Sequence, residues 1–175
     1  MNRVAAAALV ALAFLASDGA AAQATPIGSD ADACIANRGP AIRVNVTGLK
    51  DRLGRLKLEL YPATDEDFLK DDRDLVKEGK FFRRIWAATP ARGDIALCIR
   101  APAPGRYALL FTHDRDDKNK FNFWKDGAGF PSNARLGRSR PQLSQALITV
   151  GPGVTTVAVR AQYLRGLAGF GPIEP

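Results

Sequence analysis

The chain has 175 residues, of which 46% are hydrophobic and 25% are charged. These values exclude a wholly disordered chain, because the apolar fraction is large enough to form a core, and the length leaves no room for a second full-sized domain. There are 25 Lys and Arg residues against 18 Asp and Glu residues, a formal net charge of +7, which favours anionic partners.

The first 22 residues are typical of an export signal. Asn2 and Arg3 precede an unbroken apolar run from Val4 to Ala16, and three small residues end at Ala22. The run is too short to cross a bilayer, which requires about 20 apolar residues. We therefore expect cleavage near Ala22, a periplasmic or secreted protein, and no integral membrane segment afterwards. An uncleaved N-terminal anchor or a buried helix is the alternative.

The two cysteines of the chain are Cys34 and Cys98. In an exported protein this pair predicts a disulfide that fastens an N-terminal extension, residues 23–40, to the sheet. The bridge would close a loop of about 65 residues and stabilise the fold by roughly 4 kcal/mol. Two unpaired buried thiols are the alternative, since two isolated cysteines and one histidine lack the clustered spacing of a zinc site.

Alternation of apolar and polar residues predicts seven strands, and we expect Arg55, Lys57 and Glu59 to point to a wet face. Seven short strands without alternating helices predict an all-β fold over residues 41–164. The expected architecture is an antiparallel two-sheet β-sandwich of immunoglobulin or transthyretin type. The strands are expected around residues 42–46, 56–60, 81–88, 95–99, 106–112, 145–150 and 154–163.

Three segments depart from this pattern. Residues 64–80 are highly charged and carry apolar residues near helical spacing, which predicts a short helix or surface excursion with Thr64 and Asp67 at its cap. Residues 114–143 form a long loop, and loops of this length are usually functional or mobile. The Gly- and Pro-rich residues 165–175 predict a flexible tail.

The long loop begins with oxygen donors of the kind that bind Ca²⁺, which takes six to eight oxygen ligands. The candidate metal ligands are Asp114, Asp116, Asn119 and Asn122, with Asp126 further along. Lys118 places a positive charge among them, so a solvated loop without metal is the alternative.

Further motifs flank this loop. They are the run from Gly105 to the His113-Asp114 pair, the segment Gly129-Phe-Pro-Ser-Asn133, and residues 141–146. Together they resemble the bacterial domain-of-unknown-function family 2141, over roughly residues 42–163. The resemblance implies an exported β-sandwich without an established activity. His113, Asp114, Ser132 and Asn133 match the family pattern best, whereas Asp116, Lys118, Asn119 and Asn122 stand where the family has Asn, Asn, Gly and Asp.

His113 is the only histidine. Counted from Phe111, it falls on the core-facing side of its strand, which favours a structural role with hydrogen bonds to loop backbone or an acid. A hydrolase that uses His113 with Asp114 or Ser132 is the alternative, although the chain has no Gly-x-Ser-x-Gly motif.

The long loop is also rich in cations that alternate with aromatic residues. Such a surface can bind an anionic glycan or another anionic envelope component through stacking and charge, and export argues against nucleic acid. A loop whose aromatics pack on the sandwich is the alternative. We therefore expect a non-enzymatic binding module, with a calcium-stabilised fold as the second interpretation. The candidate anion-binding residues are Arg115, Lys118, Lys120, Lys125, Arg135, Arg138 and Arg140.

Overall fold

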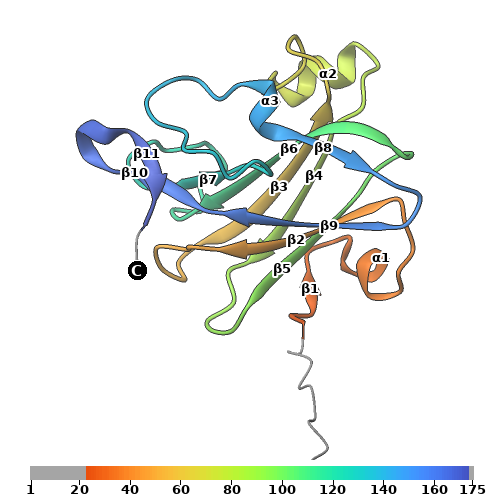
Figure 1. The fold of residues 1–175 in the computed structure, drawn as a ribbon, viewed down its shortest axis with the longest axis horizontal. Coiled ribbons are helices and arrows are strands. Elements are labelled where there is room, and N and C mark those ends of the chain that lie inside the picture. The colour runs from red at the N-terminus through yellow and green to blue at the C-terminus, as the bar shows by residue number, and fades with distance from the viewer. Residues whose placement is uncertain (1–22, 174–175) are drawn as a thin grey trace, which may run out of the picture.

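The computed structural model describes residues 23–173, so the expected export signal lies outside the described residues. Two β-sheets pack against each other (Figure 1). The first has the strand order β1-β5-β2-β9, and the second has the order β11-β10-β7-β6-β3-β4, with β8 paired to one end of β6. The elements are β1 Pro26–Ile27, α1 Ala31–Ile35, β2 Ala41–Thr47, β3 Arg55–Pro62, α2 Asp72–Lys77, β4 Arg83–Ala88, β5 Ile95–Arg100, β6 Gly105–Asp114, β7 Gly127–Gly129, α3 Leu143–Ala146, β8 Leu147–Val150, β9 Val154–Arg160, β10 Gln162–Leu164, η1 Gly166–Ala168 and β11 Phe170–Pro172.

The core lies between the sheets and is formed by the apolar residues of the alternating pattern. Leu58 of β3 pairs with Phe111 of β6, and Val44 of β2 pairs with Leu97 of β5; none of the four side chains is exposed. Each such side chain contributes about 1.5–3 kcal/mol when it leaves water. The predicted β-sandwich is confirmed.

Several details of the topology differ from the sequence-based expectation. β1 pairs with β5 and β2 pairs with β9 in parallel, whereas the other strand pairs are antiparallel. The segment expected as one strand over 154–163 is divided at Ala161, because β9 belongs to the first sheet and β10 to the second. The strands that periodicity missed, β1, β7 and β11, have two or three residues each.

The predicted disulfide joins Cys34 of α1 to Cys98 of β5. Its surroundings are buried, since Ala33, Ala41 and Cys98 are fully inaccessible to solvent. The N-terminal extension is fastened a second time by Asp30, whose carboxylate accepts from the Arg100 backbone N–H at 2.8 Å. The described part of this extension is therefore packed on the edge of the first sheet.

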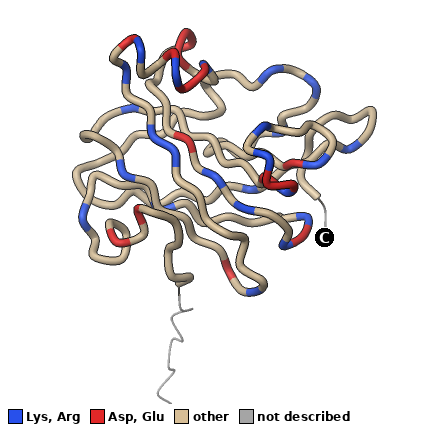
Figure 2. Tube along the Cα trace, turned by 180° about the vertical axis from the view of Figure 1, so that it is seen from behind, with Lys and Arg blue, Asp and Glu red and all other residues tan. Residues whose placement is uncertain are grey.

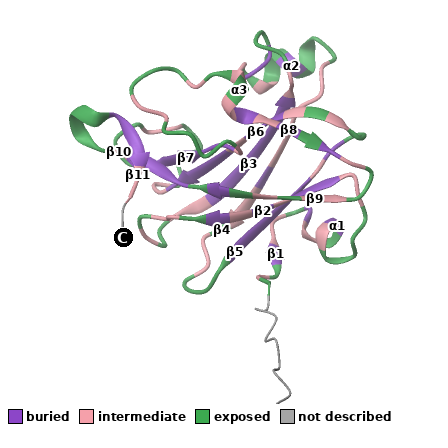
Figure 3. Ribbon diagram, viewed as in Figure 1, coloured by how far each residue is buried: buried purple, intermediate pink, exposed green. Residues whose placement is uncertain are grey.

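Two of the three residues expected on a wet face of the second sheet, Lys57 and Glu59, are mostly buried, whereas the Arg55 side chain is 31% exposed. Lys57 is 8% exposed, and Glu59 is 3% exposed. The segments 64–82 and 115–142 fold over this face and form a second apolar cluster around Phe68, Leu75 and Phe130. Figure 3 shows the resulting burial along β3 and β6. The sandwich thus carries an additional covering layer on one side.

The first covering segment contains the expected short helix, but its cap lies later in the chain. Thr64 and Asp67 bond to each other in a turn, with the Asp67 backbone N–H 3.2 Å from Thr64 Oγ1. Helix α2 begins at Asp72, and the Asp71 side chain accepts from the Arg73 backbone N–H. Aspartate is a favourable N-cap because its carboxylate satisfies an otherwise unpaired donor.

Residues 166–172 are more regular than the flexible tail that the composition predicted for residues 165–175. They form the turn η1 and the strand β11, which pairs with β10 from Phe170 to Pro172. Phe170 is 8% exposed. Among residues 23–173, no helix combines the length and apolar character needed to span a membrane.

Candidate functional site

The first turn of the long loop is organised by Asp114, the last residue of β6. Its carboxylate accepts from the backbone N–H groups of Lys118 at 3.3 Å and Asn119 at 3.1 Å. Arg55 Nε lies 3.2 Å from Asp114 Oδ2. Asn119 has a φ of +58°, a conformation that Asn tolerates better than most residues. The loop therefore curls back over its own origin.

A second carboxylate, Asp126, closes the other end of this turn. It accepts from the backbone N–H of Arg115 at 2.9 Å and of Asn122 at 2.7 Å. The Arg115 side chain points away toward Asp51, with Nε 3.0 Å from Oδ2, and this hydrogen bond lowers the pKa of Asp51. Arg115 is therefore engaged within the protein.

Three carboxylates converge inside the turn. Ligand oxygens of Asp114, Asp116 and Asp126 all lie within 4.8 Å of one another. Asp116 Oδ1 is buried and has no hydrogen-bond partner among the described residues. Its Oδ2 accepts from Asn122 Nδ2 at 3.3 Å and lies 3.6 Å from Lys125 Nζ. The chemistry of this donor set suits a hard divalent cation.

The converging set differs from the four expected ligands. Asp114 and Asp116 are members of it, and Asp126 joins them from the start of β7. Asn122 braces the loop instead, since its Oδ1 accepts from the Trp124 backbone N–H at 3.1 Å. Asn119 donates its backbone N–H to Asp114. Asp126 was expected only as an oxygen donor further along the loop, and the short strand β7, which begins at the next residue, was not predicted.

His113 lies in the core, as the alternation predicted, and is fully buried. Leu53 O can only accept, so His113 Nε2–H donates to it at 2.7 Å. Nδ1 then accepts from the Tyr163 hydroxyl at 2.7 Å, and the Tyr163 oxygen accepts from the Lys50 backbone N–H. Burial lowers the pKa of His113 and raises the pKa of Tyr163 to about 12. The imidazole is therefore neutral, with both nitrogens engaged.

Ser132 and Asn133, the other positions of the family pattern, hold the backbone after β7. Ser132 Oγ accepts from the Ala134 N–H at 3.2 Å. Asn133 Nδ2 donates to Ala158 O at 2.9 Å, and Asn133 Oδ1 accepts from the Arg160 N–H at 2.6 Å. These bonds attach the long loop to the edge of β9, which is a structural role.

A groove of about 880 Å³ opens on the outer face of the second sheet. Its floor comes from β3 and β6, one wall comes from the long loop, and the other comes from residues 164–170. The rings of Phe121, Phe123 and Phe170 lie 5.2 to 6.1 Å apart and form an aromatic cluster. Trp124 and Leu167 also line the groove, although they are 83% and 85% exposed.

The floor of the groove contains one polar pair. Lys57 Nζ lies 3.2 Å from Glu59 Oε2, and Arg84 Nε donates to Glu59 Oε1 at 2.7 Å. Lys57 and Arg55 both lie over the ring of Trp86, at 5.2 and 4.2 Å from its centroid. The charges of this pair are therefore compensated within the sheet.

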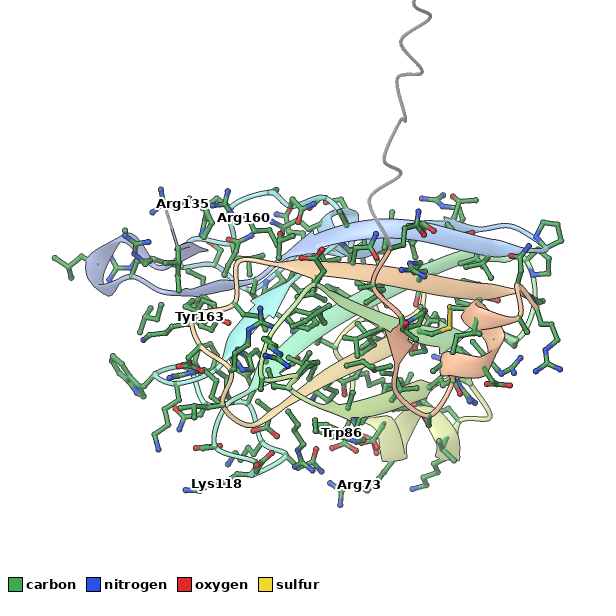
Figure 4. All side chains as sticks on the ribbon, turned by 90° about the horizontal axis from the view of Figure 1, so that it is seen from below. Arg73, Trp86, Lys118, Arg135, Arg160 and Tyr163 are labelled. Carbon is green, nitrogen blue, oxygen red and sulfur yellow. A yellow bond between two sulfur atoms is a disulfide. The ribbon has the colours of Figure 1, made fainter. Side chains whose placement is uncertain are left out.

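The seven candidate cations do not form one patch. Figure 4 shows Lys118 and Arg135 on opposite sides of the molecule, and Figure 2 shows basic segments alternating with acidic ones near the C terminus. Arg138 and Arg140 are the members that line the groove. Within residues 23–173, neither forms an ion pair, and Arg140 Nη2 makes one long bond of 3.5 Å to Phe68 O.

The structure thus places the carboxylate cluster in the first turn of the long loop and the groove on the outer face of the second sheet. Comparisons with curated protein sequences and with solved structures found no significant match. A family model described as "Uncharacterized protein conserved in bacteria (DUF2141)" matches residues 44–158, about two thirds of the chain. The chain therefore belongs to this bacterial family of uncharacterized proteins.

Proposed function

We propose that this chain is an exported, non-enzymatic binding module that takes an anionic envelope component into the groove beneath residues 114–143. The groove itself is the observation that carries the proposal. Its volume of about 880 Å³ lies in the range of ligand pockets, roughly 300–1,000 Å³. Arg138 and Arg140, which lack carboxylate partners among the described residues, supply charge for an anion.

Export is supported by the N-terminal apolar run and by the disulfide, since such bridges persist in oxidising compartments. The non-enzymatic character is supported by His113. Both of its ring nitrogens already have partners, so neither is available to take a proton from a nucleophile. A hydrolase would instead show ester or peptide turnover that disappears in His113→Ala.

Calorimetric titration of the mature chain with two soluble anions, dodecanoate and polygalacturonate, tests the proposal. We expect one of them to bind, and we expect Arg138→Gln with Arg140→Gln to weaken that binding. Arg106→Gln is the matched control, because Arg106 is exposed on β6 and does not line the groove. Absence of binding by both anions, or equal loss in the control, contradicts the proposal.

A calcium-stabilised fold is a second candidate, favoured by the buried Asp116 Oδ1, which lies among three carboxylates and has no hydrogen-bond partner within residues 23–173. Asp114, Asp116 and Asp126 would hold the ion and thereby fix the first turn of the loop. Calcium at a hundredfold excess over its dissociation constant stabilises a protein by about 2.7 kcal/mol. For a domain of this size the unfolding midpoint would rise by about 5–10 °C.

The test compares unfolding midpoints in EDTA and in millimolar Ca²⁺. We expect Asp116→Asn to abolish the rise, and Asp94→Asn, which changes an exposed aspartate outside the cluster, to retain it. A midpoint that does not respond to calcium in the unaltered chain contradicts the second candidate and leaves the groove proposal intact.

A further inference from the structure

We infer that the groove takes the acyl chain of an anionic lipid, with the charged headgroup at Arg138 and Arg140. This inference rests on the proposed function and narrows its ligand. It depends on three features of the groove: the composition of its lining, the position of its cations, and the exposed apolar residues at its opening.

The lining is apolar over most of its extent. One part of the lining is formed by Leu69, Leu110 and Leu136, which pack against the cluster around Phe130. The three-ring cluster of Phe121, Phe123 and Phe170 continues the same surface. A hydrocarbon chain would remove this surface from water, which is the main source of favourable free energy for apolar groups.

A glycan fits this lining less well, because each sugar hydroxyl removed from water requires a hydrogen-bond partner. Apart from the two arginines, the polar side chains of the lining are Lys57, Glu59, Thr112 and Ser139. Lys57 and Glu59 already bond to each other. Few groups are therefore left for the many hydroxyls of a saccharide.

The cations lie on the segment that forms one wall. Arg138 lies beside the turn at Gly169. A Cβ atom added to that glycine would lie 2.7 Å from Arg138 Cγ. Arg140 lies near Phe68 O. Guanidinium groups bind carboxylate and phosphate through paired N–H donors. An anionic headgroup can therefore be held at the wall while its chain follows the floor.

The opening carries exposed apolar side chains from two segments far apart in sequence, Trp124 of the long loop and Leu167 of η1. Lys120 lies four residues before Trp124 in the same loop, whereas Lys125 Nζ lies 3.6 Å from Asp116 Oδ2. Trp beside Lys is characteristic of surfaces that meet a lipid interface, where the ring enters the headgroup region and the ammonium meets anionic lipid. The lipid can thus pass from an interface into the groove.

The experiment uses Trp86→Phe, which leaves Trp124 as the only tryptophan of the chain. Dodecanoate below its micellar concentration, dodecanol, polygalacturonate, and vesicles of phosphatidylglycerol or phosphatidylcholine are added separately, and Trp124 emission and calorimetric heat are recorded. We expect dodecanoate to shift the emission to shorter wavelength and to bind more tightly than dodecanol. Phosphatidylglycerol vesicles should give the same shift, and phosphatidylcholine vesicles should not.

Variants distinguish the groove from a general surface effect. Arg138→Gln with Arg140→Gln should weaken dodecanoate binding about tenfold or more, while Arg106→Gln should leave it unchanged. If the protein binds polygalacturonate but not dodecanoate, the lipid inference is wrong and the proposed function is retained. If the protein binds phosphatidylglycerol vesicles but does not bind free dodecanoate, the inference that an acyl chain occupies the groove is wrong. No binding to any probe overturns both proposals.

Discussion

Because His113 is buried, the free energy of unfolding should depend on pH in the range where this imidazole titrates. Burial is the largest cause of its lowered pKa, and the hydrogen bond to Leu53 and the charge of Asp51 only partly oppose it. The unfolded chain therefore binds a proton near pH 6.5 that the folded chain still excludes. Stability is complete above pH 6.5 and is lost as the pH falls from 6.5 toward the folded pKa.

The size of the effect follows from one proton. Between the two pKa values, the free energy of unfolding should fall by at most about 1.4 kcal/mol per pH unit. Carboxylates with lowered pKa, such as Asp51 and Glu78, have unfolded values of 3.8 and 4.5. They stabilise the fold above those values and lose that contribution at lower pH, so the range from pH 6.5 to 5 reports His113.

Urea unfolding followed by circular dichroism at steps between pH 8 and pH 5 measures this slope. His113→Gln contains no histidine and should be flat over the same range, whatever its absolute stability. A flat profile in the unaltered chain would refute the buried neutral imidazole. So would an unchanged slope in the His113→Gln variant.

Other predictions concern the framework of the site. Replacing both Cys34 and Cys98 by Ala should cost roughly 4 kcal/mol, because the bridge closes about 65 residues, and should lower the unfolding midpoint by about 10 °C in calorimetry; an unchanged midpoint contradicts this. Glu59→Gln leaves buried Lys57 without its carboxylate and should cost about 3–5 kcal/mol in urea unfolding, whereas the exposed Asp94→Asn should cost almost nothing. Gly127→Ala should also destabilise, because the new Cβ would lie 2.5 Å from the Tyr163 ring; a stability equal to that of the unaltered chain refutes the close contact.

Much of the sandwich could be predicted because its main strands alternate strictly. Leu56, Leu58 and Leu60 face the core as their period of two requires, and the position of His113 followed from the same count. The alternation could not show that Lys57 and Glu59 are buried, since that burial depends on loops that return over the sheet from distant parts of the chain.

The groove could not be predicted from the sequence, for the same physical reason. Its lining extends from Lys57 to Phe170 and combines two strands with a loop and a terminal turn. The aromatic and basic character of residues 114–143 indicated a binding surface. The prediction treated seven cations as one anion-binding set, whereas Arg138 and Arg140 are the members of that set that line the groove. The carboxylate cluster was anticipated through Asp114 and Asp116, while Asp126 is brought in by the short strand β7.

The most direct test of the groove is to locate the bound anion. In ¹⁵N-labelled mature chain titrated with dodecanoate or polygalacturonate, amide shifts should change first at Leu110, Arg138 and Phe170, which line the groove on three separate segments. Amides of β5, in the opposite sheet, should remain unchanged. Saturable changes confined to β5 or to residues outside the groove, or no changes with either anion, would contradict the proposed function.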